Sequence, residues 1–559
     1  PSTGIHAKIK SILGTSAPQK LALKYLPLSK KGEPVDMTIY NYSSTYPDST
    51  IIHESCGNLM KSDVDTVWVL LVYATSTGNY EFTFYRVKEN SLIKVDDDFA
   101  EYPDAQTSSL VAAGYAVPNN GELMVANGTY SSCIPIRINA TNVRFTGQQK
   151  ENVFLENANR SASVVDFSNK GGIMKDLTVR TSGNYSAVLL SGSNITVQNV
   201  DIKARKGEVI LTGLSTLSYS SYLTLKNISI TGAATGMDVE TTYGVIENCV
   251  LNTTYSGIEC YGSNNRIRHD SITVNNAYRA ILSEPAANFG NGFCNVDSNA
   301  ITINTISSSN DGCISIKADG GTNDTSTVYI RHNNIKSAGS GFAISATNGR
   351  GPSKIVIENN SYTSTDTRGG KALNLGNSNV YIASSIIVRN NIFDGLGSQQ
   401  SIKIYGVDLI SQDQRFALYN NSFRMAANAY TDTSGYFIWI QGKSLTFEDT
   451  ANVYLVNNIF TANNHSYLVA CYSNITFYSD YNDVYNFRKY LGKGTIIGRT
   501  HDITSNPLYI DNLLHVDTFS PSIDIGASPA LFKYIPVFDI TGKTRPQGIG
   551  YDMGAYETK

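Results

Sequence analysis

A short pattern that reads apolar-x-Asn-x-apolar recurs eleven times in this chain, at separations of 21 to 37 residues. Similarity of a sequence to itself at a period of roughly 20 to 50 residues is the signature of a solenoid. The recurrent Asn fits a tight turn in left-handed backbone geometry, where its side chain can hydrogen-bond and stack as a ladder. The central residues of the eleven copies are Asp176, Asn199, Asn227, Asn248, Asp270, Asn299, Asn334, Asn360, Asn391, Asn421 and Asn458.

A second pattern, in which two apolar residues flank one other residue, follows most of these copies. Side chains alternate between the two faces of a strand, so we expect the apolar pair to point inward and the residue between them outward. Short strands of this kind, stacked rung on rung, would enclose an apolar interior. The predicted inward pairs are Ala187/Leu189, Val209/Leu211, Met237/Val239, Ile258/Cys260, Ala280/Leu282, Ile314/Ile316, Phe342/Ile344, Leu373/Leu375, Ile402/Ile404 and Ile438/Ile440.

Both ends of the repeat resemble pectate-lyase-like β-helix proteins. Residues 104–147 are similar to the opening of that fold, where a short helix caps the apolar end of the first rungs. Residues 505–557, with Ser520-Pro521-Ser522 and Tyr551-Asp552-Met553-Gly554, are similar to the closing segment of bacterial members. The resemblance implies a fold and leaves the chemistry open, because one fold hosts many functions.

We therefore expect an all-β chain: a right-handed parallel β-helix solenoid over residues 104–559, preceded by a small module over residues 1–103. The module has strand-like segments near Val64–Ala74 and Tyr80–Val87, which indicates a β-rich or α+β fold. The acidic run Asp96-Asp97-Asp98 marks the expected boundary.

Composition narrows the function classes. Only 16% of the residues are charged and the net charge is −3, which gives no electrostatic footprint for nucleic acid. No apolar run approaches the ~20 residues that span a bilayer, so any signal peptide or surface anchor is expected upstream of Pro1. The seven cysteines form no C-x-x-C pair, and we expect most of them to be buried thiols. A secreted or cell-surface protein is the resulting expectation.

The outward positions of the predicted rungs gather one acidic patch. Asp238, Glu240 and Glu259 are expected on adjacent rungs beside Tyr261, with Arg279 one rung further on. Adjacent rungs lie ~4.8 Å apart, so these carboxylates could share a proton or a calcium ion. The alternative is a solvated polar face in which the carboxylates pair with arginines. We expect no resident metal or cofactor, although calcium stays open.

The sequence also predicts an outward aromatic strip. Phe437 and Trp439 are expected to flank the inward Ile438, with Tyr405 on the preceding rung. Flat aromatic surfaces stack on the apolar faces of pyranose rings. The alternative is that a loop or the N-terminal module covers these rings.

Two functions follow from these patches. The segment Asp311-Gly312-Cys313 is similar to the catalytic stretch of polygalacturonases, but Gly312 stands where that family has a second Asp. Without a recognisable catalytic set, the chain resembles in architecture and aromatic content the tāpirins, cellulose-binding adhesins of anaerobic thermophilic bacteria. That resemblance implies a non-catalytic extracellular adhesin that binds polysaccharide such as cellulose through Trp439, Phe437, Tyr405 and Tyr261. The alternative is a lyase or hydrolase of acidic polysaccharide, centred on Asp238, Glu240, Glu259 and Arg279.

Overall fold

The structure, a computed structural model, describes most of the chain. Before residue 90 it describes only five strands. From residue 90 onward it describes every residue except 133–134, 158–161, 169, 206–207, 218, 277–278, 285–292, 305–311, 319–325, 340, 349–352, 367–368, 378–383, 398, 408–414, 428, 430–434, 443–448, 464–466, 472–474 and 492–494. Asp311 of the polygalacturonase-like segment lies outside these residues.

The N-terminal strands form one antiparallel sheet in the order β1-β2-β3-β4-β5. Strands β4 and β5 coincide with the two segments that the sequence predicts as strands. The bounds are β1 Gln19–Ala22, β2 Asp36–Ser43, β3 Ile51–Leu59, β4 Thr66–Thr75 and β5 Tyr80–Lys88.

The remaining strands pair in parallel and form a right-handed β-helix, so the predicted fold class is confirmed. The chain divides into two compact units, residues 1–240 and 241–559. In its described part, the first unit has a short helix, α2 (Leu110–Ala116), at the position of the predicted cap. Its solenoid strands are β6 Leu92–Val95, β7 Glu122–Val125, β8 Gly128–Ser132, β9 Ile136–Ile138, β10 Val143–Gly147, β11 Val153–Asn157, β12 Val165–Ser168, β13 Gly172–Thr181, β14 Gly183–Ser191, β15 Ile195–Ala204, β16 Ile210–Thr216, β17 Ser220–Ser221 and most of β18, Thr224–Thr242.

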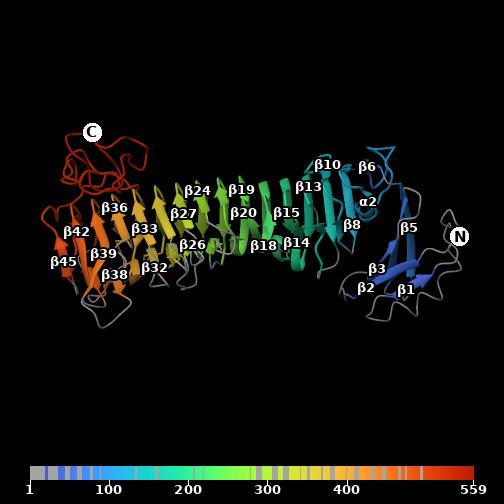
Figure 1. The fold of residues 1–559 in the computed structure, drawn as a ribbon, viewed down its shortest axis with the longest axis horizontal. Coiled ribbons are helices and arrows are strands. Elements are labelled where there is room, and N and C mark those ends of the chain that lie inside the picture. Colours follow the sequence, from blue (N-terminus) through green and yellow to red (C-terminus); the bar gives the residue numbers. More distant parts are fainter. Residues whose placement is uncertain are drawn as a thin grey trace. The chain divides into compact units, whose positions relative to one another are not determined.

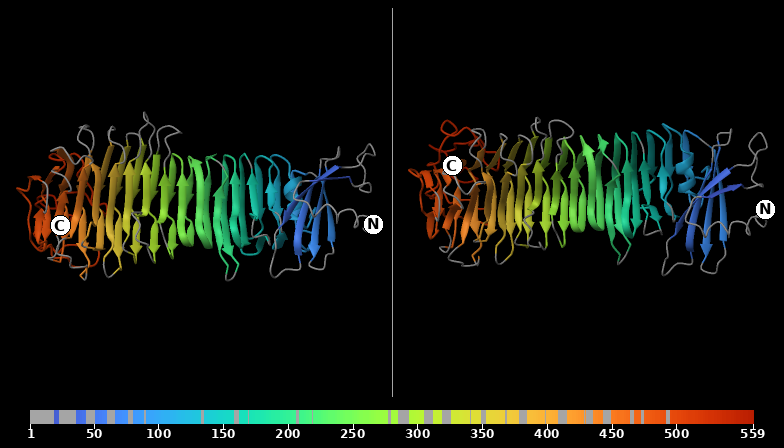
Figure 2. Two further views of the ribbon diagram at one scale, coloured as in Figure 1. Left: turned by 90° about the horizontal axis from the view of Figure 1, so that it is seen from below. Right: turned by 60° about the horizontal axis from the view of Figure 1, so that its bottom comes forward.

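The second unit repeats three short strands per rung, and they follow one another in Figures 1 and 2. Its strands are β19 Val245–Glu247, β20 Val250–Tyr261, β21 Asn265–Arg268, β22 Ser271–Val274, β23 Arg279–Glu284, β24 Phe293–Asp297, β25 Ala300–Ile303, β26 Gly312–Ala318, β27 Ser326–Arg331, β28 Asn334–Ser337, β29 Phe342–Asn348, β30 Ser353–Glu358, β31 Ser361–Ser364, β32 Lys371–Asn377, β33 Ser384–Arg389, β34 Ile392–Leu396, β35 Ile402–Val407, β36 Arg415–Tyr419, β37 Ser422–Met425, β38 Tyr436–Gly442, β39 Asp449–Val456, β40 Ile459–Thr461, β41 Tyr467–Cys471, β42 Ile475–Asp480, β43 Asp483–Tyr485, β44 Lys489–Leu491 and β45 Thr495–Gly498.

The Asn pairs of the repeat divide two roles between neighbouring residues. The first residue takes the left-handed conformation, as at Asn390 (φ 54°) and Asn457 (φ 58°). The second, as at Asn391 and Asn458, is buried with no exposed surface and hydrogen-bonds to the next rung. The left-handed turn and the stacked ladder are both present, but from Asp270 onward the left-handed residue precedes the predicted one, and Asn333 takes the ladder position expected for Asn334.

The predicted face of three rungs is wrong by one residue. Val209 and Leu211 were expected inside but are 55% and 53% exposed, whereas Ile210 is buried and pairs with Ala233. A slip of one residue exchanges the two faces of a strand, because the side-chain period is two. Runs of consecutive apolar residues contain no polar residue to mark the outer face. The same shift places Val188, Leu190, Ile281 and Ser283 inside.

The C-terminal segment folds back over the last rungs of the second unit (Figure 1). Ala527 and Ile535 pack against Ala417, Tyr419 and Val456 in one buried cluster. The left-handed Asn residues hold this closing segment through its backbone: Asn390 donates to the carbonyl of Phe538, Asn420 to that of Asp552 and Asn457 to that of Ala527.

The five cysteines that the structure describes are all buried and unpaired with one another, as the sequence predicts for most of them. Among the described residues, no helix is long and apolar enough to cross a membrane.

Candidate functional site

One outward face of the second unit carries both patches that the sequence singles out there. Parallel pairing fixes which side chains lie in line along this face, from one rung to the next. One row contains Ser315, Ser345, Asn374, Lys403, Trp439 and Ala470. The neighbouring row contains Lys317, Thr347, Gly376, Tyr405 and Gln441.

Lys403 on β35 is at the centre of the late part of this face. Its Nζ lies 5.2 Å from the centre of the Tyr405 ring and 5.4 Å from that of the Trp439 ring. Both rings face outward as predicted and are half-buried. Burial raises the pKa of Tyr405, so its hydroxyl stays neutral and can donate or accept a hydrogen bond. An ammonium within about 6 Å of an aromatic face is attracted to it, so the three side chains hold one another in place.

Gly376 on β32 provides the space for Tyr405. A Cβ atom built on Gly376 would overlap the Tyr405 ring at Cζ, Cε1 and the hydroxyl oxygen. The ring therefore lies flat on the backbone of the preceding rung. A glycine at a point of close approach in a strand has this role.

Lys371, at the start of β32, adds a second cation. Its Nζ lies 5.0 Å from the centre of the Phe342 ring. Burial, and secondarily the charge of Lys403, lower the pKa of Lys371. Neither lysine forms an ion pair with a carboxylate in the described part of the chain. We refer to Lys371, Lys403, Tyr405 and Trp439 as the lysine–aromatic site.

Phe437 does not belong to this surface, which corrects the sequence prediction. Its side chain has no exposed area and makes edge contacts with the rings of Phe423, Phe460 and Phe487, at centroid distances of 6.2, 6.2 and 5.7 Å. Strict alternation fails here because Phe437 stands near the start of β38, and both Phe437 and Ile438 are buried. The predicted strip of three aromatics is therefore reduced to two, with a lysine between them.

The second unit also contains three residues of the predicted acidic patch. Arg279 Nη2 lies 3.4 Å from Glu259 Oε1, and the Tyr261 hydroxyl donates to Glu259 Oε2 at 3.3 Å. In the next row, Glu284 stands beside Tyr261 and lies 3.7 Å from Lys317. The Glu259 carboxylate is thus compensated, as in the solvated, ion-paired alternative.

Asp238 and Glu240 lie near the end of β18, in the first unit. Asp238 stands beside Ser215 in the parallel pairing. The Glu240 backbone N–H donates to the Thr216 hydroxyl at 2.8 Å.

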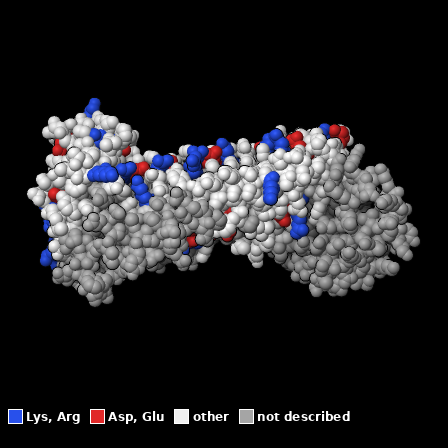
Figure 3. All heavy atoms as spheres, in the orientation of Figure 1, with Lys and Arg blue, Asp and Glu red and all other residues white. Residues whose placement is uncertain are grey.

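Sequence reasoning missed a ladder of alternating charge on another face of the second unit. Consecutive rungs place acids and arginines in register, and side chains of both signs lie close together along this edge in Figure 3. Three of its contacts are short ion pairs: 2.7 Å for Arg268–Glu247, 3.1 Å for Arg331–Asp297 and 2.6 Å for Arg389–Glu358. The signal was in the sequence, because each charge directly precedes a left-handed turn residue. The ladder is Glu247, Arg268, Asp297, Arg331, Glu358 and Arg389.

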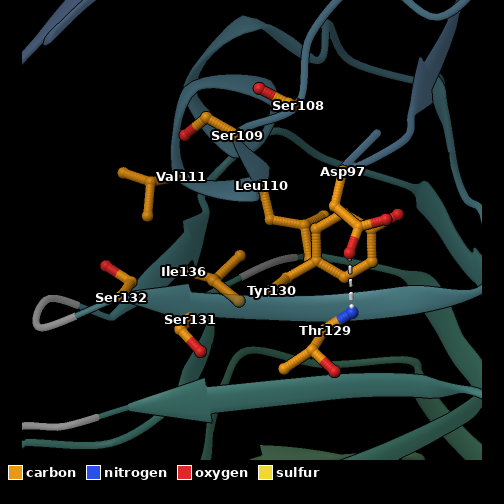
Figure 4. Close-up of a pocket in the computed structure, with 10 residues that line it drawn as sticks. All are labelled: Asp97, Ser108, Ser109, Leu110, Val111, Thr129, Tyr130, Ser131, Ser132 and Ile136. Atoms are coloured by element: carbon orange, nitrogen blue, oxygen red, sulfur yellow. Dashed lines mark hydrogen bonds between the residues drawn. The ribbon is translucent and has the colours of Figure 1, made fainter. Parts of the chain in front are cut away.

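The first unit contains a pocket of about 250 Å³ beside helix α2 (Figure 4). Leu110 and Ile136 contribute apolar surface and several hydroxyls surround it. Asp97 points into it, and its Oδ2 accepts a hydrogen bond from the Thr129 backbone N–H at 2.9 Å. The Asp96 carboxylate, in contrast, accepts backbone N–H groups of Asp98 and Tyr102 and so orders its own loop. The sequence prediction used this acidic run only as a boundary, and calcium binding by the patch of Asp238, Glu240 and Glu259 stays a prediction.

One family model agrees with the β-helix. Residues 212–383 match the family model of the right-handed β-helix region. No curated protein sequence matches the chain. Among solved structures, the catalytic domain of a GH87 α-1,3-glucanase in complex with nigerose is 11% identical, with a TM-score of 0.37, and the match covers 88% of this chain and 97% of that one. A PL6 alginate lyase in complex with a trisaccharide is 12% identical, with a TM-score of 0.33 and coverage of 82% and 96%. An alginate lyase from Paenibacillus sp. str. FPU-7 is 10% identical, with a TM-score of 0.27 and coverage of 74% and 99%.

Proposed function

We propose that this chain is an extracellular polysaccharide-binding protein and that its lysine–aromatic site holds the glycan. One observation carries the proposal: the Lys403 ammonium lies between the half-buried rings of Tyr405 and Trp439, and no described carboxylate neutralises it. Elsewhere on the second unit, arginines stand opposite acids on neighbouring rungs. A cation that no carboxylate of the described residues neutralises, beside aromatic faces, is suited to an external ligand.

The site favours an acidic glycan over a neutral one. Aromatic faces stack against the C–H groups of a pyranose ring, whereas lysine ammonium groups attract carboxylate or sulfate substituents. Lys371 adds a second positive charge near Lys403. With Phe437 buried, the flat surface that a crystalline cellulose face requires is shorter than the sequence predicted. Binding to cellulose, a neutral glycan, is therefore the alternative to binding of an acidic glycan, and the experiment below distinguishes the two.

The test compares glycans with the wild-type protein and three variants. Calorimetric titration with polygalacturonate and alginate oligosaccharides should show binding that weakens with added salt, because the lysines are half-exposed to solvent. Trp439→Ala and Lys403→Gln should each reduce affinity about tenfold, a loss of ~1.4 kcal/mol. Lys336→Gln, on the exposed side of β28, is the matched control and should bind normally. Equal binding by all four proteins would refute the site. Pull-down on microcrystalline cellulose without uronate binding would instead favour the neutral glycan.

A second candidate function is cleavage of the acidic glycan by β-elimination, and the pKa of Lys371 favours it. A lysine whose pKa is lowered carries more neutral amine, which can accept a proton. In such a step the base takes the proton beside the uronate carboxylate, a carbon–carbon double bond forms, and the glycosidic oxygen leaves with its bonding electrons and is protonated. The ion-paired Glu259 and Arg279 offer no comparable base.

Ultraviolet absorbance of unsaturated uronates separates the two candidates. A lyase should generate this signal from polygalacturonate or alginate, and Lys371→Gln should abolish it while leaving the fold intact. Tight binding without any absorbance change would leave the protein as a binding protein alone.

A further inference from the structure

A ladder of buried side chains runs through the turns of the second unit. At each step that starts from an asparagine, the backbone N–H and the side-chain Nδ2 both donate to the Oδ1 of the residue one rung further on. The six steps between asparagines have Nδ2···Oδ1 distances of 2.9 to 3.0 Å. Its members in order are Asp270, Asn299, Asn333, Asn360, Asn391, Asn421, Asn458, Asn482 and Asp502.

The ladder has a direction, so its two ends have different requirements. The bonds from one ladder member to the next all point towards higher residue numbers, and each asparagine Nδ2 also donates back to a backbone carbonyl, as from Asn299 to Ile267 and from Asn391 to Ile357. The last member only has to accept, and Asp502 does so from the backbone N–H of Asn482 at 2.8 Å and from its Nδ2 at 3.3 Å. Arg499 lies 3.6 Å from Asp502 Oδ2. The first member has to donate, and an ionised carboxylate has nothing to donate.

Asp270 stands at this first position and is 1% exposed. Its Oδ1 accepts the backbone N–H of Cys249 at 2.7 Å, and its own backbone N–H donates to Asn299 Oδ1 at 2.9 Å. Its Oδ2 is buried without a hydrogen-bond partner among the described groups. In every asparagine step, the corresponding atom is an Nδ2 that donates to the next Oδ1.

The charges around Asp270 do not favour its anion. Glu247 on β19 repels it, and Arg268 on β21 is already paired with Glu247 at 2.7 Å. Asp297 on β24 pairs with Arg331, and the adjacent His269 is exposed. Burial is the main cause that raises the pKa of Asp270, and it outweighs the backbone N–H and the thiol of Cys249, the remaining titratable neighbour, which both lower it.

We infer that the Asp270 carboxyl is protonated in the folded protein and donates from Oδ2 to Asn299 Oδ1, so that the ladder begins with a step that acid stabilises and alkali weakens. The proton takes the place of an amide hydrogen, and both oxygens of the carboxyl then have partners.

The sign of the pH dependence follows from where the proton binds. Burial raises the pKa of Asp270 in the folded chain to about 7, whereas an unfolded Asp has a pKa of about 3.9. The stabilisation is complete below the unfolded value and is lost as the pH rises towards 7. For one proton, the unfolding constant rises by up to about tenfold per pH unit in this window.

The experiment measures urea unfolding of the full chain at several pH values between about 4 and 8, which span the two pKa values. Asp270→Asn supplies a permanent donor. We expect it to be more stable than wild type above neutral pH and to lose this part of the pH dependence. Lys336→Gln, on the exposed side of β28, is the control and should keep the pH dependence of the wild type.

A second variant and a spectroscopic measurement keep the inference testable if Asp270→Asn misfolds. Asn333→Asp places an acid inside the ladder and should create a further acid-stabilised step. Infrared difference spectra between wild type and either variant should show a protonated carboxyl band that persists near neutral pH. The assignment would be overturned if the stability of Asp270→Asn and of wild type depended on pH in the same way. It would also be overturned if the infrared spectra showed no such carboxyl band.

Discussion

At the scale of single residues, Gly376 and Tyr405 show how an absent side chain defines a site. The Tyr405 ring occupies the space that a Cβ on Gly376 would need, and Lys403 lies over the outer face of that ring. The position of the cation therefore depends on a glycine one rung away. The predicted inward pairs Leu373/Leu375 and Ile402/Ile404 already align Gly376 with Tyr405, but the close approach of the ring to the glycine appears only in the structure.

Gly376→Ala tests this dependence. The added methyl group should displace the Tyr405 ring and weaken acidic glycan binding about fivefold, ~1 kcal/mol, with a smaller effect on unfolding. Calorimetric titration of the single variant and of Gly376→Ala in a Tyr405→Ala background gives a double-mutant cycle. The alanine should have no further effect once the ring is gone. An equal loss in both backgrounds would place the effect elsewhere.

The lowered pKa of Lys371 predicts how binding depends on pH. Lys371 loses its charge at a lower pH than an ordinary lysine, because burial and Lys403 both disfavour the ammonium form. Affinity for an acidic oligosaccharide should therefore start to fall on the alkaline side before ordinary lysines titrate. Lys371→Arg should remove this early decline, since arginine stays charged. An unchanged profile in that variant would show that Lys371 does not contact the ligand.

At the scale of strands and turns, the sequence predicted the repeat, but it predicted only some of the inward and outward faces of the strands. The Asn positions predicted the turns because only a few residue types accept left-handed geometry and hydrogen-bond there. The strand faces depended on polar residues between apolar ones, and the prediction failed where these were missing, at Val209–Leu211 and at Phe437. Only part of the lysine–aromatic site could be predicted from the sequence. The outward positions of Trp439 and Tyr405 followed from the alternation of side chains, but Lys371 lies at a strand start, where alternation does not apply.

The turn residue Asn457 holds the closing segment and offers a test at this scale. It donates to the Ala527 carbonyl at 2.8 Å and accepts the Ala527 N–H at 2.7 Å, with its own φ at 58°. Asn457→Ala should lower the free energy of unfolding by about 2 to 3 kcal/mol, through three lost hydrogen bonds, one of them to Asn420, and the left-handed strain of alanine. Asn457→Gly keeps the backbone geometry and should lose about 1 kcal/mol less. Identical losses in urea unfolding would assign the whole effect to the side-chain bonds.

At the scale of the whole molecule, opposite charges are largely matched inside the chain, with 44 basic and 47 acidic residues. The alternating ladder on the second unit matches its charges rung by rung, and this arrangement leaves little long-range field. The two lysines of the lysine–aromatic site depart from that arrangement. A charged ligand would therefore be recognised locally, at the site itself, and would not be steered by the protein as a whole.

The closing segment contains one pair of opposite charges that is fully buried. The side chains of Arg545 and Glu557 have no exposed area and lie 2.8 Å apart, and Arg545 also donates to the carbonyl of Gly554 and to the Asn390 side chain. Removing one partner leaves a buried charge without its counter-charge, which destabilises proteins by about 3 to 5 kcal/mol. Arg545→Met should therefore lower the free energy of unfolding by about that amount.

Replacing both partners distinguishes the ion pair from simple packing. An apolar pair of similar volume, as in Arg545→Met with Glu557→Leu, leaves no buried charge and should recover much of the loss. Recovery in urea unfolding would show that the pair matters because its charges must match. A double variant as unstable as Arg545→Met would show instead that the hydrogen bonds of Arg545 matter most: the one to Asn390 fastens the closing segment to the solenoid, and the one to Gly554 orders the segment itself.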